Sequence, residues 1–249
     1  MEPAKGQAME TMLRSVAMSG YFDVTRRLGL NPVELGQQLG NDPAALANPD
    51  DRVSATACCR LLELTADKVS CPTFALQMAE TRQKFGTGVM NVLLAHKRTL
   101  REVLLAAVQY RYLLNEALGV YIETTGDTVT IREEIVAEPG TRTVQAIELA
   151  VGVLSRHASA LLGAHWKPHS VHFTHAAPPD LTLHRRFFGC PVTFESDFNG
   201  FVCAAADLDY PNPNADPVLV RYAESLANPL NETAADSIAL EVRKAIYLL

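Results

Sequence analysis

The sequence lacks an excess of basic residues. Its 249 residues include 22 lysines and arginines against 28 aspartates and glutamates, which gives a formal net charge of −6. A protein that holds DNA by itself is expected to carry clustered lysine and arginine side chains that contact the phosphates. The composition therefore argues against a chain that binds nucleic acid alone.

Long apolar runs are also missing. No run approaches the roughly 20 residues that a membrane-spanning helix needs. The N-terminus has no charged start followed by an apolar stretch, which is the pattern of a secretory signal. Hydrophobic residues make up 48% of the chain and charged residues 20%, as in soluble globular proteins. We expect a cytoplasmic protein without a membrane partner.

Cysteine is scarce and follows no motif. The five cysteines are odd in number and widely spread, and none forms a CxxC pair, which argues against a zinc knuckle or a thioredoxin-type redox site. Histidine is denser over residues 165–184. His169 and His175 share a face of a predicted strand, but they lie roughly 20 Å apart at about 3.3 Å per residue. Two ligands that far apart cannot bind one ion, so we expect no metal site.

Motifs of catalysis or nucleotide binding are absent from the sequence. It contains no nucleophile elbow, HExxH helix, P-loop or dinucleotide fingerprint. The loop Gly86-Thr87-Gly88 lacks the further glycines of such a fingerprint and does not follow a predicted strand. We therefore expect neither an enzyme nor a cofactor.

Local signals predict helices through the first half of the chain. Pro32 and Pro43 each follow a capping Asn or Asp and open a short helix. Ser54 starts a longer amphipathic helix. Thr99, with Glu102 three positions on, forms a capping-box pattern. Further helices are predicted over residues 143–162 and 181–188, from residue 217, and over 233–249.

β-branched residues in alternation predict strands in the second half. Residues 120–124 and 129–133 flank Gly126-Asp127, which is a hairpin signal. Shorter strands are predicted over 170–174, 191–194 and 200–203. Because strands and helices do not alternate regularly, we predict an α+β fold, a mainly helical domain packed on a small, mostly antiparallel sheet.

Several short segments together are similar to a known family. The most specific is Phe187-Phe188-Gly189-Cys190-Pro191-Val192-Thr193-Phe194, which follows Trp166-Lys167-Pro168 and His172-Phe173-Thr174-His175. Weaker segments are residues 20–21, 27–32, 51–54, 86–88, 99–104 and 110–113. In order and spacing they resemble the N-terminal ligand-binding domain found in one large branch of AraC/XylS-type transcription regulators.

The resemblance implies a domain that senses a small molecule, dimerises and precedes a pair of DNA-binding helix-turn-helix units, which are absent here. We expect a loose N-terminal segment over residues 1–19 and an effector-binding and dimerisation domain over 20–249. The implied partners are a small-molecule effector, a second copy of the chain and, only through the missing C-terminal domain, DNA. Effectors of the family vary and include amino acids and hydrophobic molecules.

A sensor pocket should be largely apolar with a few fixed polar groups. The predicted helices on either side of Lys97-Arg98 offer such residues, and aromatic residues elsewhere could supply walls. Arg111 lies near two tyrosines and would suit a carboxylate or another anionic group. For each candidate the alternative is ordinary core packing. The candidate effector-binding residues are Phe85, Met90, Asn91, Leu94, Tyr110, Arg111, Leu113, Leu114, Asn115, Trp166 and Phe173.

Two other functions stay open on the sequence. One is a small-molecule enzyme of α+β fold, which would need a convergent polar site. The other is a ligand-free dimerisation module, which the absence of an internal cavity would favour. The apolar stripes of the C-terminal helices, including Leu219, Tyr222 and Leu226, could face a dimer partner, the DNA-binding helices or the domain itself.

Overall fold

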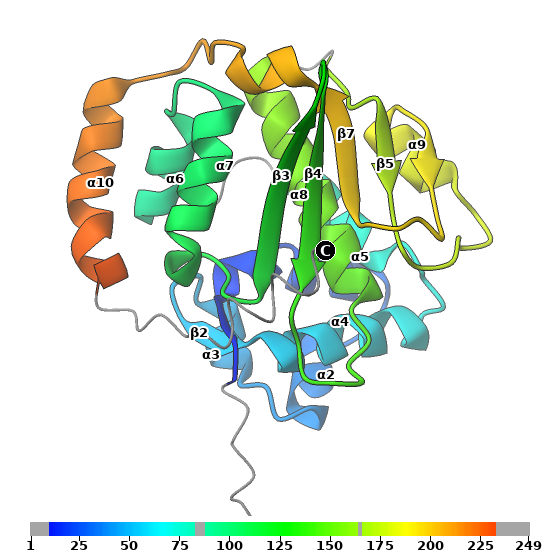
Figure 1. Cartoon of the computed structure of the whole chain (residues 1–249). Helices are drawn as coiled ribbons and strands as arrows, with labels where there is room; N and C mark the ends of the chain where they lie inside the picture. The colour runs from blue at the N-terminus through cyan, green and yellow to red at the C-terminus, as the bar shows by residue number, and fades with distance from the viewer. Residues whose placement is uncertain (1–9, 83–87, 164–165, 233–249) are drawn as a thin grey trace, which may run out of the picture.

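A twisted five-stranded sheet lies among helices that cover one of its faces and both of its ends (Figure 1). The computed structural model describes residues 10–82, 88–163 and 166–232. The α+β fold expected from the sequence is confirmed, with helix as the larger component. Phe85, His165 and the helix predicted over 233–249 lie outside the described residues.

The chain is ordered earlier than expected. Residues 1–19 were expected to be loose, but strand β1 (Met12–Arg14) pairs antiparallel with β2 (Arg52–Ser54), and the 3-10 helix η1 (Ser15–Met18) follows it. Leu13 and Met18 are buried in the main core. The expectation of a loose segment is therefore corrected for residues 12–18, where apolar contacts and strand pairing fix a stretch with weak local signals.

Three short helices come next, and the second and third begin where the proline and cap signals predicted. They are α1 (Tyr21–Arg27), α2 (Pro32–Gln38) and α3 (Pro43–Ala47). The Asn31 side chain accepts a hydrogen bond from the Val33 N–H, and the Asp42 side chain accepts one from the Ala44 N–H. Proline at the first position of α2 and α3 has no N–H that would need an acceptor.

Longer helices then build the helical part of the core. They are α4 (Ala55–Lys68), α5 (Phe74–Thr81), α6 (Gly88–Ala95) and α7 (Leu100–Gln109), and a 3-10 turn η2 (Arg111–Leu113) leads to the sheet. Ser54 caps α4 by accepting from the Ala57 N–H, and Thr99 caps α7 by accepting from the Glu102 N–H at 3.3 Å. Both predicted helix starts are confirmed.

The sheet has the order β3-β4-β7-β5-β6. Its strands are β3 (Leu118–Thr125), β4 (Thr128–Ile135), β5 (Ser170–His172), β6 (Val192–Thr193) and β7 (Gly200–Ala204). The hairpin at Gly126-Asp127 is confirmed, and only the pair β5–β6 is parallel, so the sheet is mostly antiparallel. At Gly200 a Cβ would lie 1.9 Å from the carbonyl oxygen of Ile131, so only glycine allows β7 to approach β4 there.

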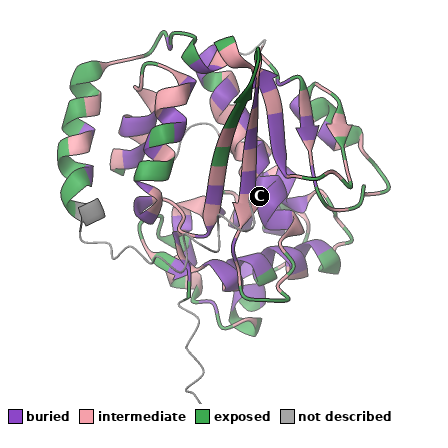
Figure 2. Ribbon diagram, viewed as in Figure 1, coloured by how far each residue is buried: buried purple, intermediate pink, exposed green. Residues whose placement is uncertain are grey.

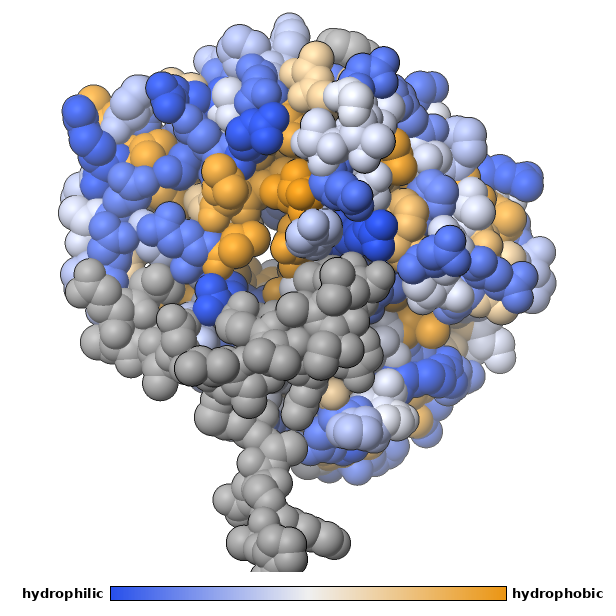
Figure 3. All heavy atoms as spheres, viewed as in Figure 1, coloured by the Kyte–Doolittle hydropathy of each residue, from blue (hydrophilic) through white to orange (hydrophobic). Residues whose placement is uncertain are grey.

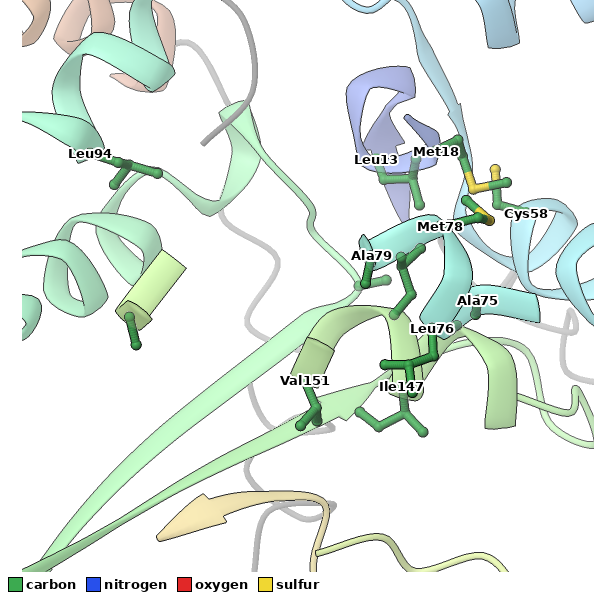
Figure 4. Packing of buried hydrophobic residues seen from close by; sticks show 14 of the residues in the cluster. Leu13, Met18, Cys58, Ala75, Leu76, Met78, Ala79, Leu94, Ile147 and Val151 are labelled. Atoms are coloured by element: carbon green, nitrogen blue, oxygen red, sulfur yellow. The ribbon is translucent and has the colours of Figure 1, made fainter. Parts of the chain in front are cut away.

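Helix α8 (Val144–Leu162) is the central support of the domain. It lies against the sheet and contacts α4 and α5 (Figure 1). In Figure 4, Ile147 and Val151 of α8 lie next to Leu76 and Ala79 of α5. A Cβ at Gly152 would lie 3.0 Å from the Cβ of Ala79, so the missing side chain lets the two helices pack closely.

The remaining elements flank this core. They are α9 (Thr182–Phe188), the 3-10 helix η3 (Ala205–Asp209) and α10 (Pro217–Glu232). Figure 2 shows α8 and the central strands largely buried, whereas α10 is mostly exposed and lies beside α6 and α7. Over residues 10–82, 88–163 and 166–232, no helix has both the length and the apolar character that crossing a bilayer requires.

Candidate functional site

A cavity of about 190 Å³ lies between α8, α4, α7 and the β3–β4 hairpin. Figure 3 shows apolar side chains gathered around a hollow between α7 and β3, the two elements whose Leu104, Ala107, Leu118 and Val120 line this cavity. Its lining residues are Leu13, Val16, Ala17, Met18, Ala55, Cys58, Cys59, Leu62, Arg82, Leu94, Leu104, Ala107, Leu114, Asn115, Ala117, Leu118, Val120, Glu133, Ile135, Ala146, Leu149, Ala150, Val153, Leu154 and His157.

Two helices supply the apolar wall through their periodicity. Residues three and four apart lie on one face of a helix. The α8 residues that reach the cavity follow this spacing, and so do those of α4. They are Ala146, Leu149, Ala150, Val153, Leu154 and His157 on α8, and Ala55, Cys58, Cys59 and Leu62 on α4. Several are alanines or cysteines, whose small side chains leave the space between the elements unfilled.

The hairpin forms the opposite wall. Leu118 and Val120 of β3 pair with Ile135 and Glu133 of β4, and all four line the cavity. Along a strand, alternate side chains face the same side. The register of the hairpin therefore places one carboxyl group, that of Glu133, among apolar side chains.

Glu133 is the acidic residue of the cavity lining, and its pKa is strongly shifted. Its side chain is buried, and its Oε2 has no hydrogen-bond partner among the residues that the structure describes. Burial, and secondarily the negative charge of Glu134, raises the pKa of Glu133 to about 8. The carboxyl is therefore mainly protonated and uncharged at neutral pH.

Arg82 supplies a positive charge at another part of the wall. Its guanidinium donates to the carbonyl of Ala17, while its Nε has no partner within the described ranges. Burial lowers the pKa of Arg82 to about 10, so the group stays charged at neutral pH. The cavity thus contains one neutral acid and one cation.

The other polar groups of the lining are Asn115, His157 and two thiols. The Asn115 side-chain oxygen accepts from the Ala117 N–H at 3.0 Å, which fixes its orientation. Burial raises the pKa of both Cys58 and Cys59 to about 12. The thiols are therefore protonated and act as small apolar groups, since the thiolate is the nucleophilic form.

Three of the sequence candidates line this cavity: Leu94 of α6, and Leu114 and Asn115 in the turn before β3. They share the space with Arg82 and Glu133, which sequence reasoning missed. Glu133 did leave a signal in the sequence. It follows Val129 and Ile131 on the apolar phase of an alternating strand, where a charged residue is unexpected.

The other described candidates lie elsewhere. Met90, Tyr110, Leu113 and Phe173 are buried in the core without lining the cavity, and Asn91 is half-buried on α6. The Tyr110 hydroxyl donates to the Asn228 side chain at 2.5 Å, and Trp166 donates to Asp207 at 2.8 Å. The part of these residues in effector binding stays a prediction.

Arg111, the candidate for an anionic group, lies outside the cavity as well. Its guanidinium lies over the ring of Tyr112, with 4.9 Å to the ring centre, and donates to the Val108 carbonyl. An Arg111→Ala variant with an unchanged response to effector would contradict the proposed anion site.

The dense histidine segment forms a different cluster. The buried Glu148 of α8 accepts from His184 of α9 at 3.0 Å, and His175 lies 3.4 Å from the same oxygen. Phe173 and Phe194 surround the two imidazoles. In the part of the chain that the structure describes, no group of three or more His, Cys, Asp or Glu residues is placed to hold a metal ion.

Comparison with known families and proteins gives three findings. The family described as the arabinose-binding domain of AraC transcription regulator, N-terminal, matches residues 29–212. The HTH-type transcriptional regulator VirS of Mycobacterium tuberculosis, recorded for strains CDC 1551 and H37Rv, is 25% identical over 242 residues. That match covers 95% of this chain and 71% of the VirS protein.

Among solved structures, the transcriptional regulator CdpR from Pseudomonas aeruginosa has a similar fold. The TM-score is 0.58 at 16% sequence identity, and the match covers 90% of this chain. The chain spans 66% of the length of the solved CdpR chain. At this identity the likeness concerns the fold alone.

Proposed function

The chain belongs to the AraC-type transcription regulators as their effector-binding N-terminal domain, and from this premise we propose that the cavity between α8, α4 and the β3–β4 hairpin is the effector site. The family is one of sensor domains, not of enzymes. The observation that carries the proposal is a cavity of about 190 Å³ with an apolar lining and few polar groups, which is the usual character of a small-molecule site.

The lining also favours one chemical class of effector. Leucine, valine, alanine and protonated cysteine make up most of the wall. A mostly apolar molecule gains from leaving water there, whereas a highly charged one would lose its hydration with few partners. We therefore propose a small, largely hydrophobic effector. The cavity argues against the alternative of a ligand-free dimerisation module.

Side-chain contacts connect the cavity to α10 through α7. Leu104 and Ala107 of α7 line the cavity, and the Tyr110 hydroxyl just after α7 donates to Asn228 of α10. Lys97 also forms an ion pair with Glu224 of α10 at 2.7 Å. We propose that the effector shifts the population of α7–α10 arrangements, and that this changes DNA binding by a helix-turn-helix unit such as the name of VirS indicates.

We also propose that the domain dimerises through α7 and α10. Leu105, Val218 and Tyr222 are each more than half exposed, at 57%, 64% and 64%. Exposed apolar residues gathered on neighbouring helices are typical of protein interfaces. Sedimentation should show a dimer that Tyr222→Glu weakens, whereas Tyr210→Glu, at another exposed tyrosine, leaves it intact. A wild-type monomer at all concentrations would contradict the proposal.

The test of the effector site is to fill the cavity from α8. In Ala150→Phe the new ring enters the cavity, so a molecule that co-purifies with the wild-type chain in native mass spectrometry should be lost. Ala160→Phe is the matched control, since Ala160 lies exposed on the same helix and does not line the cavity. A ligand retained by Ala150→Phe would place the effector site elsewhere.

A further inference from the structure

Two neighbouring glutamates of β4 have opposite surroundings. Glu134 faces one side of the sheet, where its carboxylate accepts from the Asn199 amide at 2.6 Å. Glu133 faces the other side with Val129 and Ile131, and only 2% of its surface is exposed. Because neighbouring residues of a strand face opposite sides, the register itself places the Glu133 carboxyl against the cavity.

The Glu133 carboxyl is unusual for a buried polar group. Its Oε2 has no hydrogen-bond partner in the described part of the chain, although buried polar atoms in proteins are nearly always paired. An apolar side chain at this position would pack without that cost. The Glu133 carboxyl costs stability and borders the cavity, so it is suited to bind a polar group of a molecule inside the cavity.

We propose that Glu133 is the polar anchor of the cavity, and that it binds an uncharged ligand that is apolar except for one hydroxyl or amide N–H group. This inference rests on the proposed function of the cavity and names the chemical class of its ligand. The ligand's N–H or O–H donates to the unpaired Oε2, and the rest of the molecule contacts the α8 and α4 wall.

The charges around the cavity favour an uncharged ligand. A cation at Glu133 would share the cavity with the charged Arg82 and would meet a carboxyl without charge, and an anion would lose its hydration among mostly apolar side chains. The other titratable groups that line the space are His157 of α8 and the protonated thiols of Cys58 and Cys59 on α4. The raised pKa of Glu133 agrees with this, since a protonated carboxyl offers a cation no charge.

The volume of the cavity guides the choice of probe molecules. A cavity of 150 Å³ lined by apolar side chains can hold benzene, so a space of about 190 Å³ holds a molecule slightly larger than benzene. Benzyl alcohol, benzylamine and ethylbenzene are suitable probes because they have the same size and shape. Benzyl alcohol carries an uncharged donor, benzylamine carries a cation, and ethylbenzene carries no polar group.

The experiment is a cycle of these probes with Glu133 variants, in which dissociation constants are measured by NMR titration of the purified chain. Glu133→Leu should weaken benzyl alcohol binding about tenfold relative to ethylbenzene, since the donor loses its acceptor. Glu133→Gln, which keeps an acceptor, should stay within about threefold of wild type. Glu134→Gln on the other face is the control and should leave the ratio unchanged.

Each other outcome overturns the inference in a distinguishable way. If all probes bind and none depends on Glu133, the cavity is a ligand site but Glu133 is not its anchor. If benzylamine, or benzoate as an added anionic probe, depends on Glu133 more than benzyl alcohol does, the ligand is not uncharged. If no probe binds to wild type and Ala150→Phe behaves the same, the proposed function of the cavity fails together with the inference.

Discussion

Helix α8 has two faces that differ in how well they are filled. On one face, Gly152 lets α5 approach until the site of its missing Cβ is 3.0 Å from the Cβ of Ala79, and Glu148 pairs with His184. On the other, Ala150 and Val153 leave a cavity of about 190 Å³. Small residues thus have opposite effects on the two faces of α8. At Gly152 they allow α5 to pack closely, and at Ala150 they leave space between α8 and the opposite wall.

The two faces of α8 differ in what they contribute: the packed face to stability, and the open face to the proposed effector site. The packed face holds α8 against α5 and α9. The open face gives up packing contacts, which costs stability but leaves space for a ligand. Substitutions on the two faces should therefore differ in their effect on stability, and at neutral pH the larger losses are expected on the packed face.

Among the substitutions on α8, Glu148→Ala should have the largest effect on stability at neutral pH. It removes the acceptor of the buried His184 and leaves that imidazole unpaired, which should cost about 3 kcal/mol in the free energy of unfolding. Urea unfolding measures the change. Glu148→Gln keeps an acceptor and should lose less, and an equal loss in both variants would show that the Glu148 charge, not the hydrogen bond, stabilises the packed face.

Gly152→Leu should destabilise the domain by about 2 kcal/mol, because the side chain must displace Leu76 and Ala79 of α5. The melting temperature should fall accordingly. Ala160→Leu adds the same group at an exposed site of α8 and should change little. If Gly152→Leu melts as wild type does, the close packing of α5 on α8 is not required.

Glu133 should make stability fall as the pH rises. Its pKa is about 8 in the folded chain against an ordinary value of 4.5, so between these values the folded state binds more protons than the unfolded state. The free energy of unfolding of the wild type, relative to that of Glu133→Gln, should then fall by up to about 1.4 kcal/mol per pH unit from pH 5 to 8.

Urea unfolding across that pH range tests this prediction. Glu134 also has a raised pKa because of burial, but the hydrogen bond from Asn199 opposes the shift. The stability difference between wild type and Glu134→Gln should therefore change less with pH than the difference between wild type and Glu133→Gln. Parallel pH profiles of wild type and Glu133→Gln would mean that the Glu133 carboxyl titrates normally.

Ala150→Leu should have the smallest effect and the opposite sign. The added carbons enter the empty space on the open face, and filling a cavity commonly stabilises a protein by about 1 kcal/mol. Thermal unfolding should show a modest increase in the melting temperature together with weaker ligand binding. A decrease would show that the open face is already filled in solution.

The fold was predictable where local chemistry decides it. The caps at Asn31, Asp42, Ser54 and Thr99 start helices as expected, and Gly126-Asp127 turns the hairpin. Strand β1 was not predicted, since three residues carry little propensity and it exists through its pairing with β2. Short segments of this kind depend on partners distant in the sequence.

The site was predictable only in part. Leu94, Leu114 and Asn115 were candidates and line the cavity, whereas Tyr110 and Phe173 share the same residue character and lie in the filled core. An apolar side chain contributes to a core or to a cavity according to what lies opposite it. That depends on the packing of α4, α8 and the hairpin, which no local pattern contains.

The sequence by itself determined the α+β class, the helix starts, the hairpin and the membership in a regulator family, because capping, alternation and motif order are properties of neighbouring residues. Only the tertiary structure decided that a cavity forms between α8 and β4 and that the Glu133 Oε2 faces it without a hydrogen-bond partner among the described residues. Burial and hydrogen-bond pairing arise from segments distant in the chain, so they come into existence only when the chain folds.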